Sequence, residues 1–163
     1  MYLWNNHLSH FYVPNLGRKI LHFLYLFAVL VLLVSCGEPE PETPIEINWG
    51  KDICTHCRMI IKDQHFGAQV RGGQENKVYL FNELGSAMLW LEKQPWGNDE
   101  TTKIWVIDYN TGYWLDARFA NYLPEQPTPM NYGFSAIKSP IKGSVNFETA
   151  KRRLLAKKLG RQQ

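Results

Sequence analysis

The chain has 163 residues, 45% of them hydrophobic, which suits a single domain with a modest core. Its formal net charge is +3, and removal of the N-terminal segment described below takes away Arg18 and Lys19 and no acidic residue, which leaves +1. A near-neutral chain gives no support for nucleic-acid binding. The sequence contains neither a phosphate-binding loop nor a set of nucleophile, base and orienting residue, so we expect no enzymatic activity.

The N-terminal segment is typical of an export signal. Arg18 and Lys19 precede an apolar run at 20–34, and small residues lead to Cys36, a pattern that indicates a cleaved signal and not a membrane span. The Leu-x-Ser-Cys ending resembles the lipobox of bacterial lipoproteins. It implies lipidation of Cys36 and a periplasm-facing lipoprotein of the bacterial cell envelope, for which the outer membrane is a compatible location. A short membrane anchor and an ordinary cleaved signal are the alternatives.

Glutamate and proline alternate directly after Cys36, and such a composition builds no core. We therefore predict a lipoprotein signal peptide at 1–35, an extended tether at 36–44 and a folded domain at 45–163. Alternation of apolar and polar residues predicts a short strand at 45–49.

The first half of the domain reads as strand, strand, helix. Strands are predicted at 66–71 and 77–81, joined by a glycine turn into a hairpin. Asn82 is the predicted N-cap of the following helix, which runs to about residue 93 and carries Met88 on its buried stripe.

The second half repeats this order. Strands are predicted at 103–109 and 113–117, a proline-marked loop follows at 124–129, and another strand occupies 132–137. The final helix is predicted to start near Asn146. The sequence thus predicts a single small α+β domain of two strand-strand-helix halves.

A sulfur-rich motif, Cys54-Thr-His-Cys57-Arg-Met59, lies between the first two predicted strands. The only other cysteine is Cys36, so Cys54 and Cys57 either pair with each other or hold a metal. A redox dithiol has no use for a thioether, whereas Cu(I) prefers thiolate and thioether ligands, so Met59 favours copper. Its alternative role is that of a core methionine.

Other kinds of cysteine site fit less well. A zinc ribbon needs a second pair of ligands, for which only His56 and His65 remain, and covalent haem attachment is excluded because position 58 is not histidine. A thiol-disulfide oxidoreductase is the alternative function, but its cysteines start a long helix, and the residues after Cys57 are strand-like. A structural disulfide also stays open.

Several segments together resemble the NosL family, accessory lipoproteins of nitrous oxide reductase maturation. They comprise 52–59, 66–69, 79–81, Gly85, 105–108, 114–117 and 128–133. The resemblance implies a Cu(I) chaperone that delivers copper to the reductase cluster beside a membrane transporter complex, and a fold of two treble-clef-like units.

The resemblance also implies a ligand set. The family motif matches Cys54, Cys57 and Met59, and Met130 matches the methionine of a later Pro-Met segment, where packing is an equal alternative. Arg58 departs from the family, which usually has glycine there. If that position requires a positive φ angle, the local turn is expected to differ in this chain.

Overall fold

The computed structural model describes the backbone of residues 16–33 and 43–160, and the side chains of 17–25 and 43–157. The chain divides into two compact units, Met1–Pro41 and Glu42–Gln163. The first contains helix α1 (Leu16–Leu33), which spans most of the apolar run. Among the described residues no helix combines the length and the hydrophobicity needed to cross a membrane. Cys36 and most of the predicted tether lie outside the described residues.

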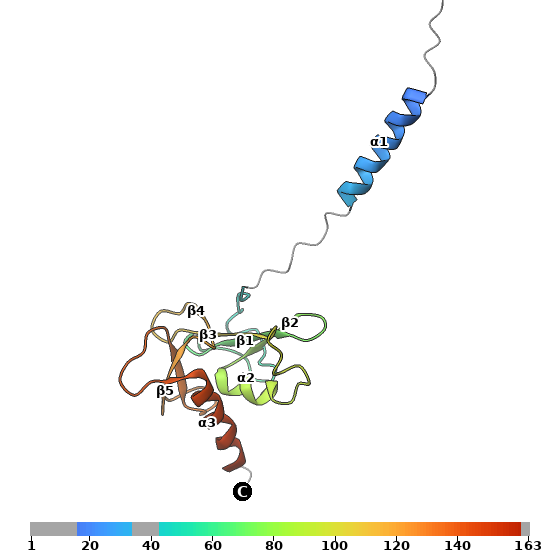
Figure 1. Ribbon diagram of the computed structural model, residues 1–163. Helices are drawn as coiled ribbons and strands as arrows, with labels where there is room; N and C mark the ends of the chain where they lie inside the picture. Colours follow the sequence, from blue (N-terminus) through green and yellow to red (C-terminus); the bar gives the residue numbers. More distant parts are fainter. Residues whose placement is uncertain (1–15, 34–42, 161–163) are drawn as a thin grey trace, which may run out of the picture. The chain divides into compact units, whose positions relative to one another are not determined.

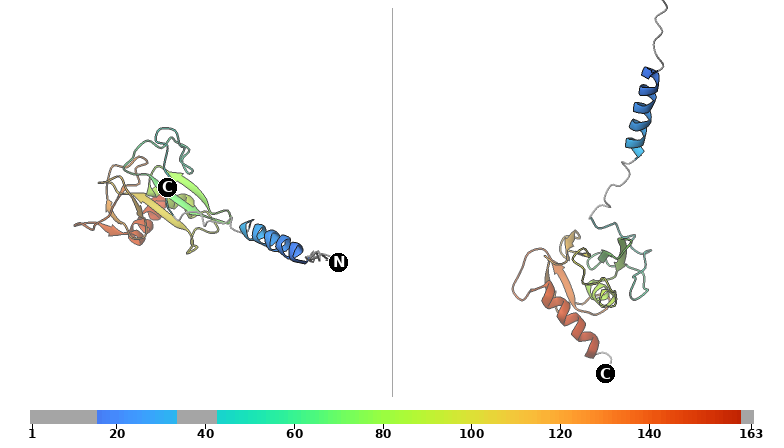
Figure 2. Two further views of the ribbon diagram at one scale, coloured as in Figure 1. Left: turned by 90° about the horizontal axis from the view of Figure 1, so that it is seen from above. Right: turned by 45° about the vertical axis from the view of Figure 1, so that its right-hand side comes forward.

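The second unit is an α+β domain, as predicted. It contains strands β1 (Ala68–Gly72) and β2 (Lys77–Phe81), helix α2 (Leu84–Leu91), strands β3 (Lys103–Ile107), β4 (Trp114–Asp116), β5 (Asn121–Pro124), β6 (Phe134–Ile137) and β7 (Val145–Asn146), and helix α3 (Phe147–Gly160). The two helices pack against each other, on the same side of the four-stranded sheet (Figures 1 and 2).

The strands form two antiparallel sheets. The first has the order β2-β1-β3-β4 and the second the order β6-β5-β7. The hairpin of β3 and β4, predicted as part of the second half, therefore joins β1 of the first half, with Val70 opposite Ile104. A parallel bridge between Asp108 and Ala136 connects the two sheets.

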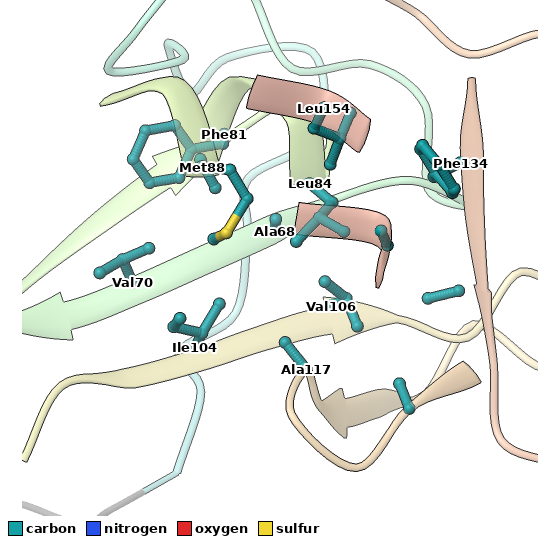
Figure 3. Close-up of a cluster of buried hydrophobic side chains, with 14 of the residues drawn as sticks. Ala68, Val70, Phe81, Leu84, Met88, Ile104, Val106, Ala117, Phe134 and Leu154 are labelled. Atoms are coloured by element: carbon teal, nitrogen blue, oxygen red, sulfur yellow. The ribbon is translucent and has the colours of Figure 1, made fainter. Parts of the chain in front are cut away.

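The buried stripe of α2 covers the first sheet. Met88 is 1% exposed and lies among side chains of β1 and β3 (Figure 3), so its predicted role in the core is confirmed. Leu154 of α3 reaches the same cluster, which joins both helices to the sheet in one core. Helical periodicity was sufficient to predict α2, whose apolar residues at helical spacing lie in this core.

Three local predictions were wrong. Residues 45–49 form no strand, because β1 already has β2 and β3 on its two edges, and Ile45 instead bonds through its backbone to the side-chain amide of Gln69. No strand was predicted at 121–124, where the structure has β5, which pairs with β6; it overlaps the predicted loop at 124–129 only at Pro124. The N-cap of α2 is Glu83 and not Asn82.

Candidate metal centre

Residues 54–59 form a tight turn, which we call the cysteine turn. A bridge between Ile53 and Ile60 closes it, the Cys54 amide donates to the carbonyl of Met59 at 2.9 Å, and the Arg58 amide donates to the carbonyl of Cys54 at 3.0 Å. Six residues, 54–59, therefore connect two antiparallel segments, and both cysteines stand on this short connection. The cysteine turn is anchored to β2 by a bond of 2.8 Å from the Thr55 amide to the carbonyl of Leu80.

Arg58 takes the left-handed conformation that the turn requires. Its φ angle is 65°, a region that glycine enters freely and other residues enter at a cost. We expected the local turn to differ from that of the family if position 58 requires a positive φ angle. The turn does have a positive φ angle at this position, and arginine adopts it.

The two thiols differ in exposure. Cys54 is completely buried, whereas Cys57 is half-buried, and both are free thiols. The backbone amide of Cys57 donates to Cys54 Sγ at 3.4 Å, so the backbone of the second cysteine lies next to the first sulfur. Asn82 Nδ2 donates to Cys57 Sγ at 3.3 Å. Each sulfur thus accepts a hydrogen bond that would stabilise a thiolate.

Burial raises the pKa of the Cys54 thiol above its ordinary value. The backbone amides of Cys57, Asn82 and His56 act in the opposite direction, and the neighbouring Cys57 thiol adds to the rise. Because burial dominates, Cys54 keeps its proton at neutral pH in the metal-free protein. A metal that binds Cys54 must displace that proton.

Met59 lies at the surface with 55% of its area exposed, in contrast to the core residue Met88. Its thioether stands on the cysteine turn and is accessible from outside the protein. The alternative of a core methionine is therefore inconsistent with the structure. Ile53 and Ile60, which flank the cysteine turn, are also exposed, and so is the charged residue Arg58.

Met130 lies on a second loop, residues 128–133, which we call the Met130 loop. Its amide donates to Glu83 Oε1 at 3.1 Å, and the amide of Tyr132 donates to the same oxygen at 3.4 Å. Glu83 follows Asn82, the residue that contacts Cys57. The cysteine turn and the Met130 loop are therefore anchored on two consecutive residues at the start of α2.

The histidines take different positions. His65 is exposed, and its Nδ1 lies 2.8 Å from the carbonyl of Tyr109, which holds the ring on the β3–β4 turn. His56 is half-buried on the cysteine turn. Within residues 17–25 and 43–157, whose side chains are described, no group of three His, Cys, Asp or Glu side chains could hold a metal ion. Beyond the two thiols, a third ligand to a metal at the cysteine turn would therefore be a thioether or come from another molecule.

Asn82 and Glu83 were missed as site residues by the sequence reasoning. Both are buried polar residues at the junction between β2 and α2. Their position directly after strand β2 was the available signal, but helix capping explained one of them equally well. Only the contacts across the fold reveal what the two side chains hold.

No protein-family model matches the chain, and no curated protein matches it by sequence. Among solved structures, the fold is similar to that of the copper chaperone NosL from Shewanella denitrificans, with a TM-score of 0.51 and 16% sequence identity. The similarity covers 72% of this chain and 89% of that chain. At this identity the likeness concerns the fold, and the chain shares the architecture of a copper chaperone.

Proposed function

We propose that this protein is a Cu(I)-binding metallochaperone. The observation that carries the proposal is the cysteine turn, which presents two free thiols and an exposed thioether within six residues. Thiolate and thioether ligands select Cu(I) over harder or borderline ions. The proposed ligands are Cys54, Cys57 and Met59, with Met130 as a further candidate.

The difference in burial gives each ligand a role in transfer. Cys54 is enclosed and holds the ion from the protein side, whereas Cys57 and Met59 are accessible to a partner. An incoming ligand can bind the copper on this open side before Cys57 and Met59 dissociate. No free ion is released in such an exchange, and no catalytic step is needed.

The proposed recipient is the assembling copper cluster of nitrous oxide reductase, or the transporter complex of its maturation. Two observations support this choice: the motifs that resemble the NosL family, and the fold shared with a copper chaperone of that name. The proposed location is the periplasmic side of the cell envelope, where a lipid on Cys36 would attach the protein to the membrane.

A Cu(I) titration of the reduced full chain against a competing chelator tests the proposal. We expect tight binding that is lost in Cys54→Ser/Cys57→Ser. Met88→Leu, which changes a thioether in the core, serves as the matched control and should bind as the wild type does. Unchanged affinity in the double serine variant would contradict the proposal.

The same preparation tests the thiol-disulfide oxidoreductase. In the structure the cysteines lie on a turn between two extended segments and not at the start of a helix. We therefore expect no insulin reduction above the level of the double serine variant. Cysteine-dependent insulin reduction together with weak Cu(I) binding would favour the thiol-disulfide oxidoreductase over the chaperone.

A further inference from the structure

The start of α2 contains a buried carboxylate whose bonds reach across the domain. Glu83 is 1% exposed, and its Oε1 accepts the amides of Met130 and Tyr132, 47 and 49 residues away in sequence. A buried carboxylate is costly unless it is hydrogen-bonded, so these contacts require an explanation. Ordinary capping does not provide one, because the Glu83 side chain makes no cap bond to its own helix.

We propose that Glu83 is a positioning residue that docks the Met130 loop beside the cysteine turn, so that Met130 can complete the copper site. The inference rests on the proposed function. Asn82, the preceding residue, donates to Cys57 Sγ, and its backbone amide acts on Cys54. The same two-residue junction therefore contacts both thiols and carries the loop that presents the thioether.

The Met130 loop is held by contacts from several sides. Asn131 adopts a φ angle of 57° and Gly133 one of 88°, and the Gly133 amide donates to Thr128 Oγ1 at 3.0 Å. Lys157 on α3 donates to the carbonyl of Asn131 at 2.9 Å. Glu83 is the contact that attaches this folded loop to the cysteine side of the domain.

The packing of Tyr132 supports the same role. A Cβ atom at Gly85, in the first turn of α2, would lie 2.3 Å from Tyr132 Cγ. The ring of Tyr132 thus lies directly on the helix backbone, where only glycine leaves room. The carboxylate of Glu83 and the gap at Gly85 together fix the distance between the Met130 loop and the start of α2.

Methionine methyl NMR of the reduced full chain, labelled with ¹³C at the ε-methyl groups, tests the inference. The sequence contains four methionines, and Met88 in the core reports whether the domain is folded. On addition of Cu(I), we expect the methyl signals of Met59 and Met130 to shift in the wild type. Met130→Leu assigns the second signal.

In Glu83→Ala we expect the Met130 shift to be lost while the Met59 shift and the Met88 signal persist. The Cu(I) affinity should fall by the same factor as in Met130→Leu. Glu83→Gln keeps an oxygen acceptor and should restore the Met130 response. Glu148→Ala, an exposed glutamate at the start of α3, is the matched control and should leave every signal unchanged.

If Glu83→Ala unfolds the domain, the Met88 signal shows it, and Glu83→Asp replaces that variant. Aspartate keeps the charge and withdraws the acceptor by one methylene, so the Met130 response should weaken. A full Met130 response in a folded Glu83→Ala or Glu83→Asp variant would overturn the inference. The inference would also be overturned if Cu(I) bound to the wild type through the cysteines without shifting the Met130 signal. Cu(I) binding that does not depend on either cysteine would instead contradict the proposed function itself.

Discussion

Burial separates the two thiols of the cysteine turn more sharply than their spacing suggests. Cys54 is enclosed, Cys57 three positions later is half-buried, and Met59 is exposed. A carrier needs this asymmetry, because one ligand must retain the ion while the others exchange.

The raised pKa of Cys54 predicts how Cu(I) affinity depends on pH. The buried thiol holds its proton at neutral pH and must release it to bind copper, so the affinity should rise with pH by about tenfold per pH unit for each proton released. Competition titrations at about pH 6, 7 and 8 measure this slope. Cys54→Ser should have a shallower slope, and an equal slope would contradict the assignment of the proton to Cys54.

Removal of the side-chain amide of Asn82 should weaken copper binding without unfolding the domain. Its bond to Cys57 Sγ becomes charge-assisted when the sulfur is a thiolate, and such bonds contribute roughly 1.5–3 kcal/mol, or about tenfold to a hundredfold in affinity. We expect a loss of this size in Asn82→Ala in the chelator titration. Asn121→Ala is the matched control and should bind copper normally. It removes a side-chain amide on β5 that donates to the backbone carbonyl of Lys138.

Replacement of Arg58 by glycine should stabilise the protein. The left-handed conformation of Arg58 costs about 1 kcal/mol, and glycine removes most of that cost despite its greater freedom in the unfolded chain. We expect a higher midpoint in urea unfolding for Arg58→Gly. Lys62→Gly, also exposed but without a positive φ angle, should show no gain, and an equal gain in both variants would point to charge instead of backbone strain.

At the scale of elements, α2 organises the candidate site. The apolar stripe that predicted the helix from sequence packs it on β1 and β2, and this packing places its first residues beside the cysteine turn. The length of the helix was predictable because periodicity is a local property. The hydrogen-bond partners of the Asn82 and Glu83 side chains were not predictable, because these partners come from distant segments of the chain.

Gly85→Ala should reverse the usual effect of alanine in a helix. Alanine normally favours a helix by about 1 kcal/mol over glycine, but here its Cβ would overlap the ring of Tyr132. We expect a lower melting temperature and a displaced Met130 methyl signal. Glu148→Ala, at an exposed position in the first turn of α3, is the control that should show no such loss.

At the scale of the whole molecule, membrane attachment is predicted to depend on one residue. Cys36 lies outside the described residues, and its role comes from the lipobox-like pattern alone. We expect the wild type in the membrane fraction with the added mass of lipid, and Cys36→Ser without that mass. Cys54→Ser should remain lipidated, and lipid on Cys36→Ser would contradict the assignment.

The sequence by itself determined the α+β class, the order of most strands and helices and the motif with two cysteines and a methionine. Each of these depends on periodicity or spacing within a short stretch, which any fold must respect. Only the tertiary structure decided that β3 joins β1, that Cys54 is enclosed while Met59 is exposed, and that Glu83 holds the Met130 loop. These features depend on pairings between residues far apart in the chain, where burial and hydrogen bonding of the folded domain select one partner among many.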